Sequence, residues 1–121
     1  MQYATIGGSQ GICPAGWHIP TLAEFQTLSA VVNSDGNSLK EIGEGTGGGV
    51  GTNESGFSAL LTGFRGTPGG FGHLDYDASI WSSSEGGTNV TYRLYLYYGD
   101  SVISLGIDEK GYGFSVRCIK D

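Results

Sequence analysis

Hydrophobic residues near the N-terminus recur at the spacing of one face of an α-helix: Leu22, Phe25, Leu28 and Val32. Thr21 begins this stretch and Glu24 follows three residues later, which is the capping-box pattern that starts many helices. The spacing therefore predicts a helix over residues 21–32. A second, shorter helix is expected over residues 38–42, after the turn-forming Asp-Gly pair at 35–36.

The C-terminal half shows the two-residue alternation of β-strands instead. Over residues 90–98, one face carries Val90, Tyr92, Leu94 and Leu96, and the other carries Thr91, Arg93, Tyr95 and Tyr97. We expect the first face to be core and the second to face water. Strands over 90–98, 101–107 and 113–119 would form an antiparallel meander, and further strands are expected over 3–6 and from residue 80. Helices early and a twisted sheet late predict an α+β fold.

Composition limits the class of protein. The length of 121 residues indicates one domain, and 23 glycines, many of them within residues 43–56, indicate long loops. Twelve acidic and six basic residues give a net charge of −6, which argues against a nucleic-acid partner. No apolar run approaches the ~18 residues of a membrane span. The residues after Met1 lack the features of a signal peptide, so the chain is either made for the cytosol or had an export signal that was removed.

Two cysteines stand near opposite ends of the chain. Cys13 and Cys118, with the distant His18 and His73, make a poor four-ligand zinc set, so no metal is expected there. A disulfide between the cysteines would stabilise the fold by roughly 4 to 5 kcal/mol in the chain-entropy model. It would also indicate an exported or surface protein. Two buried free thiols are the alternative.

No catalytic motif stands out, and we expect neither an enzyme nor a cofactor. The glycines at 43, 45 and 48 fit G-x-G-x-x-G but lack the strand before and the helix after that a dinucleotide site needs. A thiol nucleophile at Cys13 beside His18 is disfavoured, because the cysteine has a partner in the other half of the chain. Asp75 and Asp77 could hold calcium with loop carbonyls, although a solvated acidic loop is the default expectation.

The aromatic and imidazole side chains near the N-terminal motif have structural interpretations. Trp17 and Trp81 each lie in a compact segment beside turn residues, and we expect both to pack in the core because an indole buries a large area. His18 lies between Trp17 and Ile19 and is expected to be a structural histidine with satisfied hydrogen bonds rather than a catalytic one.

Five sequence blocks, in order along the chain, resemble a known bacterial family: CPAGWHIPT (13–21), NESGFSAL (53–60), GFR (63–65), WSSSE (81–85) and GFSVRC (113–118). They are similar to the Fibrobacter succinogenes major paralogous domain, within the wider group of C-type-lectin-like domains. The resemblance implies a single C-type-lectin-like domain over residues 1–121, with two helices packed on a twisted antiparallel sheet. It also implies that the chain ends meet and that Cys13 lies near Cys118. Members occur in surface or secreted proteins of gut-type Bacteroidetes and Fibrobacteres, so an extracellular or cell-surface location is expected.

Similar domains also serve as the variable proteins of diversity-generating retroelements, in which adenine-directed mutagenesis rewrites the ligand-facing residues. Starting from Asn codons that end in a pyrimidine, such mutagenesis never reaches Lys, Glu, Gln, Trp or Met. Between residues 86 and 112, only Glu109 and Lys110 fall outside the reachable set. The composition of this segment is compatible with diversification, although a strand-and-turn region avoids most of these residues in any case.

Tyrosines gather in the C-terminal half: Tyr92, Tyr95, Tyr97, Tyr98 and Tyr112. Exposed tyrosines among Ser, Asp and Gly are typical of antibody-like binding sites. We therefore predict a noncatalytic module that binds a protein or glycan ligand on a cell or phage surface. The predicted site comprises Arg93, Tyr95, Tyr97, Asp100, Ser104, Asp108 and Tyr112.

Three alternatives remain for this cluster and for the domain. Cross-strand pairs of aromatic residues could simply stabilise the sheet. The domain could be a structural or adhesive surface module without a variable site. An enzyme is suggested by the related fold of formylglycine-generating enzymes, but those rely on reactive cysteines.

Overall fold

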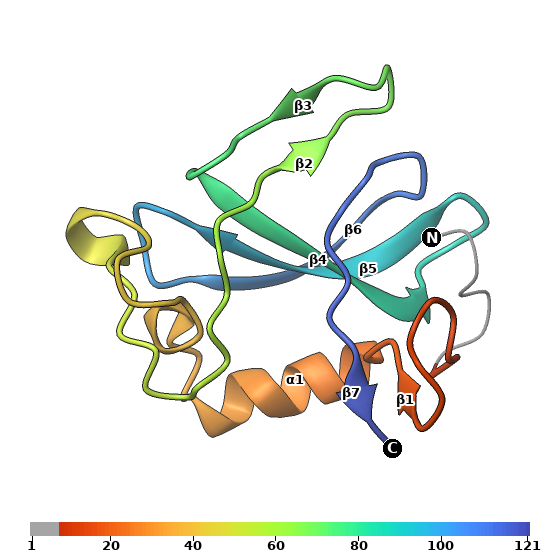
Figure 1. Ribbon diagram of the computed structural model, residues 1–121, viewed down its shortest axis with the longest axis horizontal. Helices are drawn as coiled ribbons and strands as arrows, with labels where there is room; N and C mark the ends of the chain where they lie inside the picture. The colour runs from red at the N-terminus through yellow and green to blue at the C-terminus, as the bar shows by residue number, and fades with distance from the viewer. Residues whose placement is uncertain (1–7) are drawn as a thin grey trace.

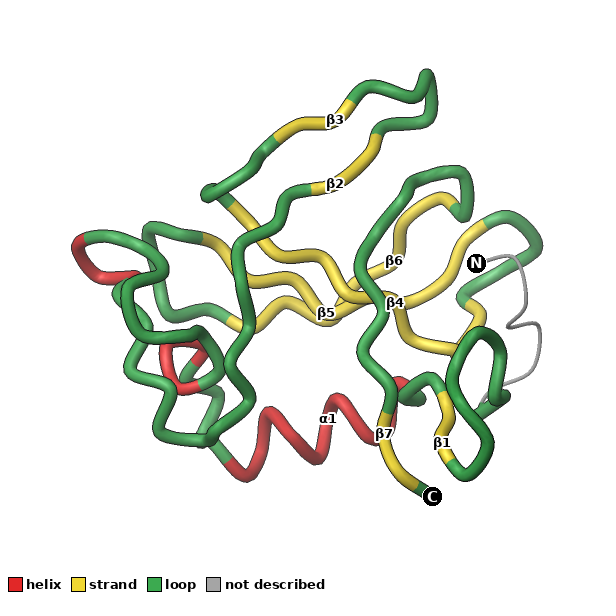
Figure 2. Tube along the Cα trace, viewed as in Figure 1, coloured by secondary structure: helices red, strands yellow, loops and turns green. Residues whose placement is uncertain are grey.

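The computed structural model describes residues 8–121. The strand expected over residues 3–6 lies outside this range. Figure 2 shows short strands and one α-helix joined by long loops, as the glycine content predicts.

A three-stranded antiparallel sheet forms the middle layer of the molecule (Figure 1). Its strands, in order across the sheet, are β4 (Asp77–Glu85), β5 (Val90–Tyr97) and β6 (Ile103–Glu109). The register pairs Leu94 with Ile80 on one side and with Leu105 on the other, so these side chains share one face. Leu94 and Leu96 are fully buried on this inner face, which confirms the predicted core side of β5.

The meander is built from different strands than predicted. The strand before β5 takes part, whereas residues 113–119 do not add to the free edge of β6. Ser115 instead forms a parallel bridge with Ile80, and the Trp81 N–H donates to the Ser115 carbonyl (2.9 Å). The last segment thus pairs with the edge of β4 that β5 leaves open. The prediction assumed that each strand pairs with its neighbour in the sequence. Residues 113–119 instead cross back over a long sequence distance to pair with β4.

The helix α1 (Leu22–Val31) covers the inner face of the sheet (Figure 1). The Thr21 hydroxyl oxygen accepts a hydrogen bond from the Glu24 N–H (3.2 Å), which confirms the predicted cap. Phe25 is the buried helix residue, and it packs in one cluster with Leu39 and the inner-face leucines of β5. This cluster is the main hydrophobic core.

The second predicted helix, over residues 38–42, is wrong. A 3-10 turn, η1 (Gly36–Ser38), forms instead, and the Asp35 side chain accepts a hydrogen bond at its start. Lys40 then forms a parallel bridge with Ala59. A five-residue helix would be marginal on its own. The backbone hydrogen bonds of Leu39 and Glu41 with Ala59, together with those of the Lys40 side chain, favour the non-helical path.

Lys40 fixes the glycine-rich loop that follows. Its side chain is fully buried, and its Nζ donates to the carbonyls of Gly49 (2.9 Å), Tyr97 (2.5 Å) and Asp100 (2.7 Å). The loop residue Gly49, in the 3-10 turn η2 (Gly47–Gly49), lies so close to the Tyr98 carbonyl that a Cβ would collide with it. The glycines here therefore allow two backbone segments to meet around one ammonium group.

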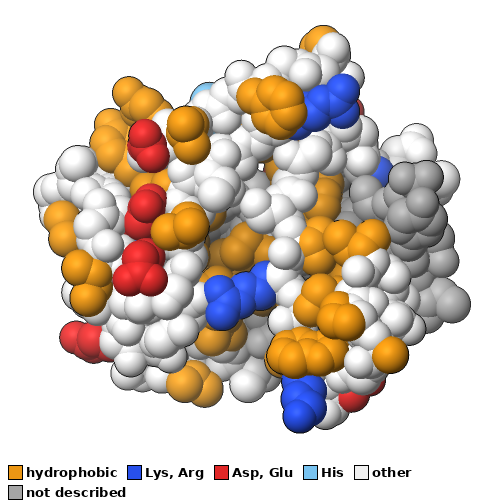
Figure 3. All heavy atoms as spheres, in the orientation of Figure 1, with side chains coloured by type: hydrophobic (Ala, Val, Ile, Leu, Met, Phe, Trp, Pro, Cys, Tyr) orange, Lys and Arg blue, Asp and Glu red, His pale blue; other side chains and the backbone are white. Residues whose placement is uncertain are grey.

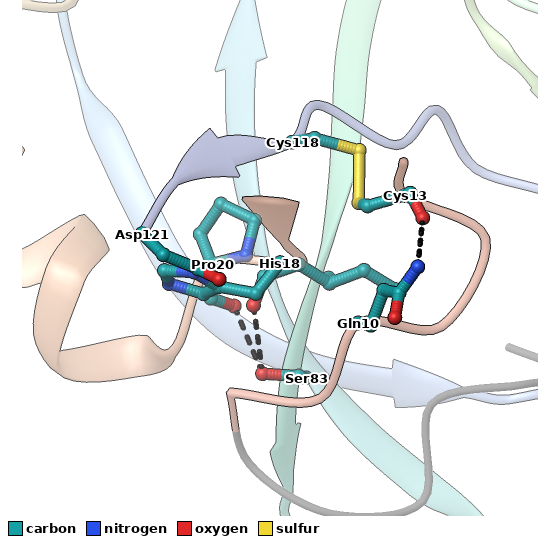
Figure 4. The surroundings of a disulfide bond; sticks show 8 residues. Gln10, Cys13, His18, Pro20, Ser83, Cys118 and Asp121 are labelled. Carbon is teal, nitrogen blue, oxygen red and sulfur yellow. Dashed lines mark hydrogen bonds and ion pairs between the residues drawn. A yellow bond between two sulfur atoms is a disulfide. The ribbon is translucent and has the colours of Figure 1, made fainter. Parts of the chain in front are cut away.

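The two ends of the chain are clasped together. The short strands β1 (Trp17–His18) and β7 (Ile119–Lys120) pair in antiparallel fashion. A disulfide joins Cys13 to Cys118, with 5.8 Å between their Cα atoms, so the expected bond is confirmed. Figure 4 shows Gln10 beside it, with the side-chain amide donating to the Cys13 carbonyl (2.9 Å).

His18 adds a polar bridge to the clasp. Its Nδ1 lies 2.6 Å from Asp121 Oδ1, and its Nε2 lies 2.9 Å from both carboxylate oxygens of Glu24. The hydrogen bond to Asp121, followed by the one to Glu24, raises the pKa of His18 above its ordinary value. Both ring nitrogens of His18 therefore have hydrogen-bond partners, as expected from the sequence.

A small hairpin stands on the side of the sheet opposite α1 (Figure 1). It consists of β2 (Phe64–Arg65) and β3 (Phe71–Gly72). With one α-helix and antiparallel sheets, the molecule is a small α+β domain. Within residues 8–121, no helix has both the length and the apolar character needed to cross a bilayer.

Candidate functional site

A cleft of about 180 Å³ opens on the outer face of the sheet, away from α1. Arg93 and Tyr95 of β5 and Asp108 of β6 lie side by side at its base, because their backbone positions share one face of the pleated sheet. Tyr112 reaches the same cleft from the turn after β6. The structure thus brings together Arg93, Tyr95, Asp108 and Tyr112 of the predicted site.

The Arg93 guanidinium lies over Gly106 of β6. Its Nε donates to Asp108 Oδ2 at 2.8 Å, and its Nη1 lies 3.4 Å from the Ser104 hydroxyl. The strand partner of Arg93 is Gly106, and this residue leaves room for the guanidinium to pass. The guanidinium also lies 5.2 Å from the centre of the Tyr95 ring, within the range of a cation–π contact. Ser104 therefore belongs to the site as a neighbour of Arg93.

Asp77 forms the buried polar floor of the cleft. Its side chain is 2% exposed, and its Oδ2 accepts hydrogen bonds from His73 Nδ1 (2.6 Å) and the Tyr95 hydroxyl (3.4 Å). Its Oδ1 is buried without a hydrogen-bond partner among the described residues. Burial, and then the Asp77 carboxylate, raise the pKa of Tyr95 to about 12, so this phenol is a hydrogen-bond donor at neutral pH.

The interpretation of Asp75 and Asp77 as a solvated acidic loop is wrong for Asp77. This residue begins β4 and points into the outer face, so the strand buries it. Asp75 has a left-handed backbone (φ 67°), and its N–H donates to the Leu61 carbonyl. Across residues 8–121, no group of three or more His, Cys, Asp or Glu side chains is arranged to hold a metal ion.

Stacked aromatic rings form one wall of the cleft. Tyr112 stacks on Phe114 with 5.6 Å between ring centres, and the edge of Phe64 meets Tyr112 at 5.8 Å. Behind them, Trp81 is buried and packs on Phe114 at 4.3 Å, as expected for a core tryptophan. Sequence reasoning missed Phe64, His73, Asp77 and Phe114 as cleft residues. The GFR and GFSVRC blocks were the available signal, but they served only to identify the family resemblance and gave no direction for the rings.

Tyr97 and Asp100 lie apart from the cleft lining, at the other end of β5. Tyr97 packs edge-on against Tyr98 (4.7 Å), which in turn meets Tyr76 (4.9 Å). Asp100 turns inward in part, since its side chain accepts from the Val102 N–H and its carbonyl accepts from Lys40. Hydrogen bonding to Tyr98 raises the pKa of Tyr97. The seven predicted residues thus divide into a cleft group and a separate tyrosine cluster.

Two predictions of exposure are wrong. Thr91 was expected on the wet face, but it is buried because β4 bulges between Trp81 and Glu85 and covers it; its hydroxyl donates to the Ser84 carbonyl (2.6 Å). Trp17 was expected in the core, but this residue is 38% exposed. It belongs to β1, which pairs with β7 in a two-stranded sheet separate from the central sheet.

Comparisons with known proteins place the chain in a family. Residues 2–120 match the model of the Fibrobacter succinogenes major domain. No curated protein and no solved structure matches the chain. Because the family model spans almost the whole sequence, the chain belongs to the Fibrobacter succinogenes major domain family.

Proposed function

We propose that this domain is a noncatalytic binding module that holds a ligand in the outer-face cleft. The observation that carries the proposal is the cleft itself, where polar groups and aromatic rings converge on one open cavity. The aromatic rings offer flat apolar surface, while Arg93, Asp108 and the Tyr95 hydroxyl offer directional hydrogen bonds. Such a mixture suits a protein loop or a sugar ring, which has apolar faces and polar edges.

A binding role without chemistry is supported by the state of the cysteines. Both are joined in the disulfide, so neither offers the thiolate that a cysteine nucleophile requires. The disulfide also supports a location at the cell surface or outside the cell, where such bonds persist. On this proposal the scaffold is C-type-lectin-like, and the ligand lies on a cell or phage surface.

Diversification of residues 86–112 is part of the proposal. The outer side chains of β5 and β6 can change while Leu94 and Leu96 on the inner face remain, because alternate residues of a strand point to opposite faces. Sequencing the flanking DNA tests this part. A near-copy of these codons that differs mainly at adenines, next to a reverse transcriptase gene, is expected; without such a copy this part of the proposal fails.

The binding proposal is tested by screening the purified protein against glycan and surface-protein arrays. The combined variant Asp108→Ala with Tyr112→Ala should bind any captured ligand at least tenfold more weakly, because it removes a charged rim and an aromatic wall. Tyr76→Ala, which removes an exposed tyrosine outside the cleft lining, is the matched control and should bind normally. Equal loss in both variants would show that the cleft is not the site.

An alternative role as an adhesive module is favoured by a different observation. Exposed hydrophobic side chains lie on and after the β3 segment, including Phe71 (86% exposed), Leu74 and Tyr76. A patch of this kind can pack on a neighbouring domain. Sedimentation that shows a stable dimer, lost on Phe71→Ser, would favour this alternative.

A further inference from the structure

A second cavity, of about 280 Å³, lies on the opposite side of the sheet between α1 and the clasp of β1 and β7. Its lining is mainly hydrophobic and includes Trp17, Leu28 and Phe57. Three charged side chains also reach it: Glu24, Arg117 and Lys120. Figure 3 shows this face of the molecule, on which basic side chains stand beside hydrophobic surface.

The exposed tryptophan is the first sign that this cavity binds something. Trp17 leaves 38% of its surface open, whereas Trp81 leaves 2%. Ile119, on the paired strand, is 39% exposed beside the same cavity. Open aromatic and aliphatic surface around a hollow is typical of a site that is covered by a ligand.

The charged residues around the cavity indicate that this ligand carries a negative charge. Of the six basic residues, Arg93 and Lys110 have ion-pair partners and Lys40 is buried. The other three, Arg65, Arg117 and Lys120, have no carboxylate within ion-pair distance among residues 8–121. Arg117 and Lys120 both line this cavity, in a chain of net charge −6.

Neighbouring groups leave these two cations available. Glu24 is the one carboxylate of the lining, and both of its oxygens are engaged by His18 Nε2 at 2.9 Å. The Arg117 guanidinium lies 4.3 Å above the Phe57 ring, and its Nη1 donates to the Phe57 carbonyl. Its remaining N–H groups have no hydrogen-bond acceptor among the described residues. Arg117 is thus held in place with donors to spare.

The clasp makes the lining rigid. The disulfide at Cys118 fixes the backbone next to Arg117, and the strand register sets Trp17 opposite Lys120. A ligand would find the indole, the guanidinium and the ammonium group already in position, which lowers the entropy lost on binding.

We propose that this cavity binds the carboxylate end of an apolar molecule. The apolar part would lie against Trp17 and Phe57, and the carboxylate would pair with the Arg117 guanidinium, assisted by Lys120. The cavity is near the small end of ligand sites, so it accommodates one ring or branched side chain with its carboxylate. The same chemistry occurs in a free aromatic acid and in the carboxy-terminal residue of a peptide.

The test is calorimetric titration with N-acetyl-phenylalanine, with its amide, and with N-acetyl-alanyl-alanyl-phenylalanine. The two acids should bind and the amide should bind at least tenfold more weakly, because the charge is lost. Tighter binding of the tripeptide would identify a peptide terminus as the source, and equal binding of the two acids would identify a free acid. Binding of the amide as tight as the acid, or no binding of either acid at millimolar concentration, would overturn the proposal.

Variants locate the site. Arg117→Gln should reduce acid affinity at least tenfold, while the matched Arg65→Gln, at an exposed arginine outside this cavity, should bind as wild type. If Arg117→Gln does not fold, Arg117→Lys keeps the charge and should lose several-fold in affinity, because an ammonium group cannot pair bidentately. Binding of the acid should also change the tryptophan fluorescence of the wild type. Trp17→Phe should abolish this change, since the buried Trp81 lies outside the cavity. Wild-type affinity in a folded Arg117 variant would refute the assignment.

Discussion

At one end of the molecule a covalent bond holds the chain, and at the other end a single buried ammonium group does so. The clasp joins segments 105 residues apart through Cys13 and Cys118. The Lys40 anchor joins the glycine-rich loop to the turn after β5 through three backbone carbonyls. Both ends are mostly loop, so few helix or sheet hydrogen bonds hold either of them; at the clasp the sheet hydrogen bonds are those of the two-residue strands β1 and β7.

The two devices act on different states of the chain. The disulfide mainly restricts the unfolded chain, whereas Lys40 acts only in the native state, where its removal leaves carbonyls without donors. The clasp should therefore respond to reductant and the anchor should not. The predictions below test this contrast, from the largest effect to the smallest.

Removing the disulfide should have the largest effect. We expect Cys13→Ala with Cys118→Ala to lower the free energy of unfolding by about 4 kcal/mol, because the loop that it closes is long. Chemical denaturation with and without reductant measures this. Wild-type protein in reductant should match the variant, and a loss below about 1 kcal/mol would show that the polar bridge of the clasp suffices.

Replacing Lys40 should have the second-largest effect on stability. Lys40→Met keeps much of the stem but leaves the carbonyls of Gly49, Tyr97 and Asp100 unsatisfied, so we expect a loss of about 3 kcal/mol. Hydrogen exchange should increase in residues 43–51 and much less in the clasp. Lys110→Met, at a partly exposed lysine that pairs with Glu85, is the control and should cost little.

The close approach of Gly49 to the Tyr98 carbonyl offers a second test of the Lys40 anchor. Gly49→Ala should lower stability by about 2 kcal/mol, because its Cβ would collide with the Tyr98 carbonyl. The neighbouring Gly48→Ala places its Cβ 3.7 Å from the Gly99 carbonyl, in ordinary contact, and should be nearly neutral. Thermal melts of the pair decide this, and equal melting temperatures would contradict the close approach.

The smallest effect concerns the polar bridge of the clasp. Because the pKa of His18 is raised in the folded state, protonated His18 contributes stability fully below about pH 6.5, and this contribution is lost as the pH rises through the raised pKa. His18→Gln should lower Tm by a few degrees at pH 5.5, and by progressively less toward pH 9. A difference from wild type that is constant over this range would exclude the ion pairs.

The sequence allowed the locally determined parts of the fold to be predicted. The Thr21–Glu24 cap and the hydrophobic spacing after it predict α1, and the alternation along β5 predicts which of its leucines are buried. The disulfide was one of two open alternatives until the family resemblance favoured it. The helix predicted over residues 38–42 does not form, because the tertiary hydrogen bonds of the Lys40 side chain outweigh a weak helical preference.

The candidate cleft was only half predictable. Its floor and rim, Arg93, Tyr95 and Asp108, follow from strand alternation and pairing of neighbours. Its wall depends on the long-range bridge of Ser115 to Ile80, which brings Phe114 beside Trp81. His73 enters through a left-handed backbone (φ 61°), which hydrophobic periodicity does not indicate. The exposure of Trp17 could not be predicted from the local sequence either, because it depends on how the other elements pack around β1.

The disulfide has a mechanical consequence. Tension on the chain beyond Cys13 and Cys118 passes from one end to the other through the sulfur atoms and bypasses residues 14–117. The sheet, the helix and the outer-face cleft thus form a side branch that carries no load. In a protein pulled by flow or by a moving cell, this domain would keep its shape at forces that unravel domains without such a bond.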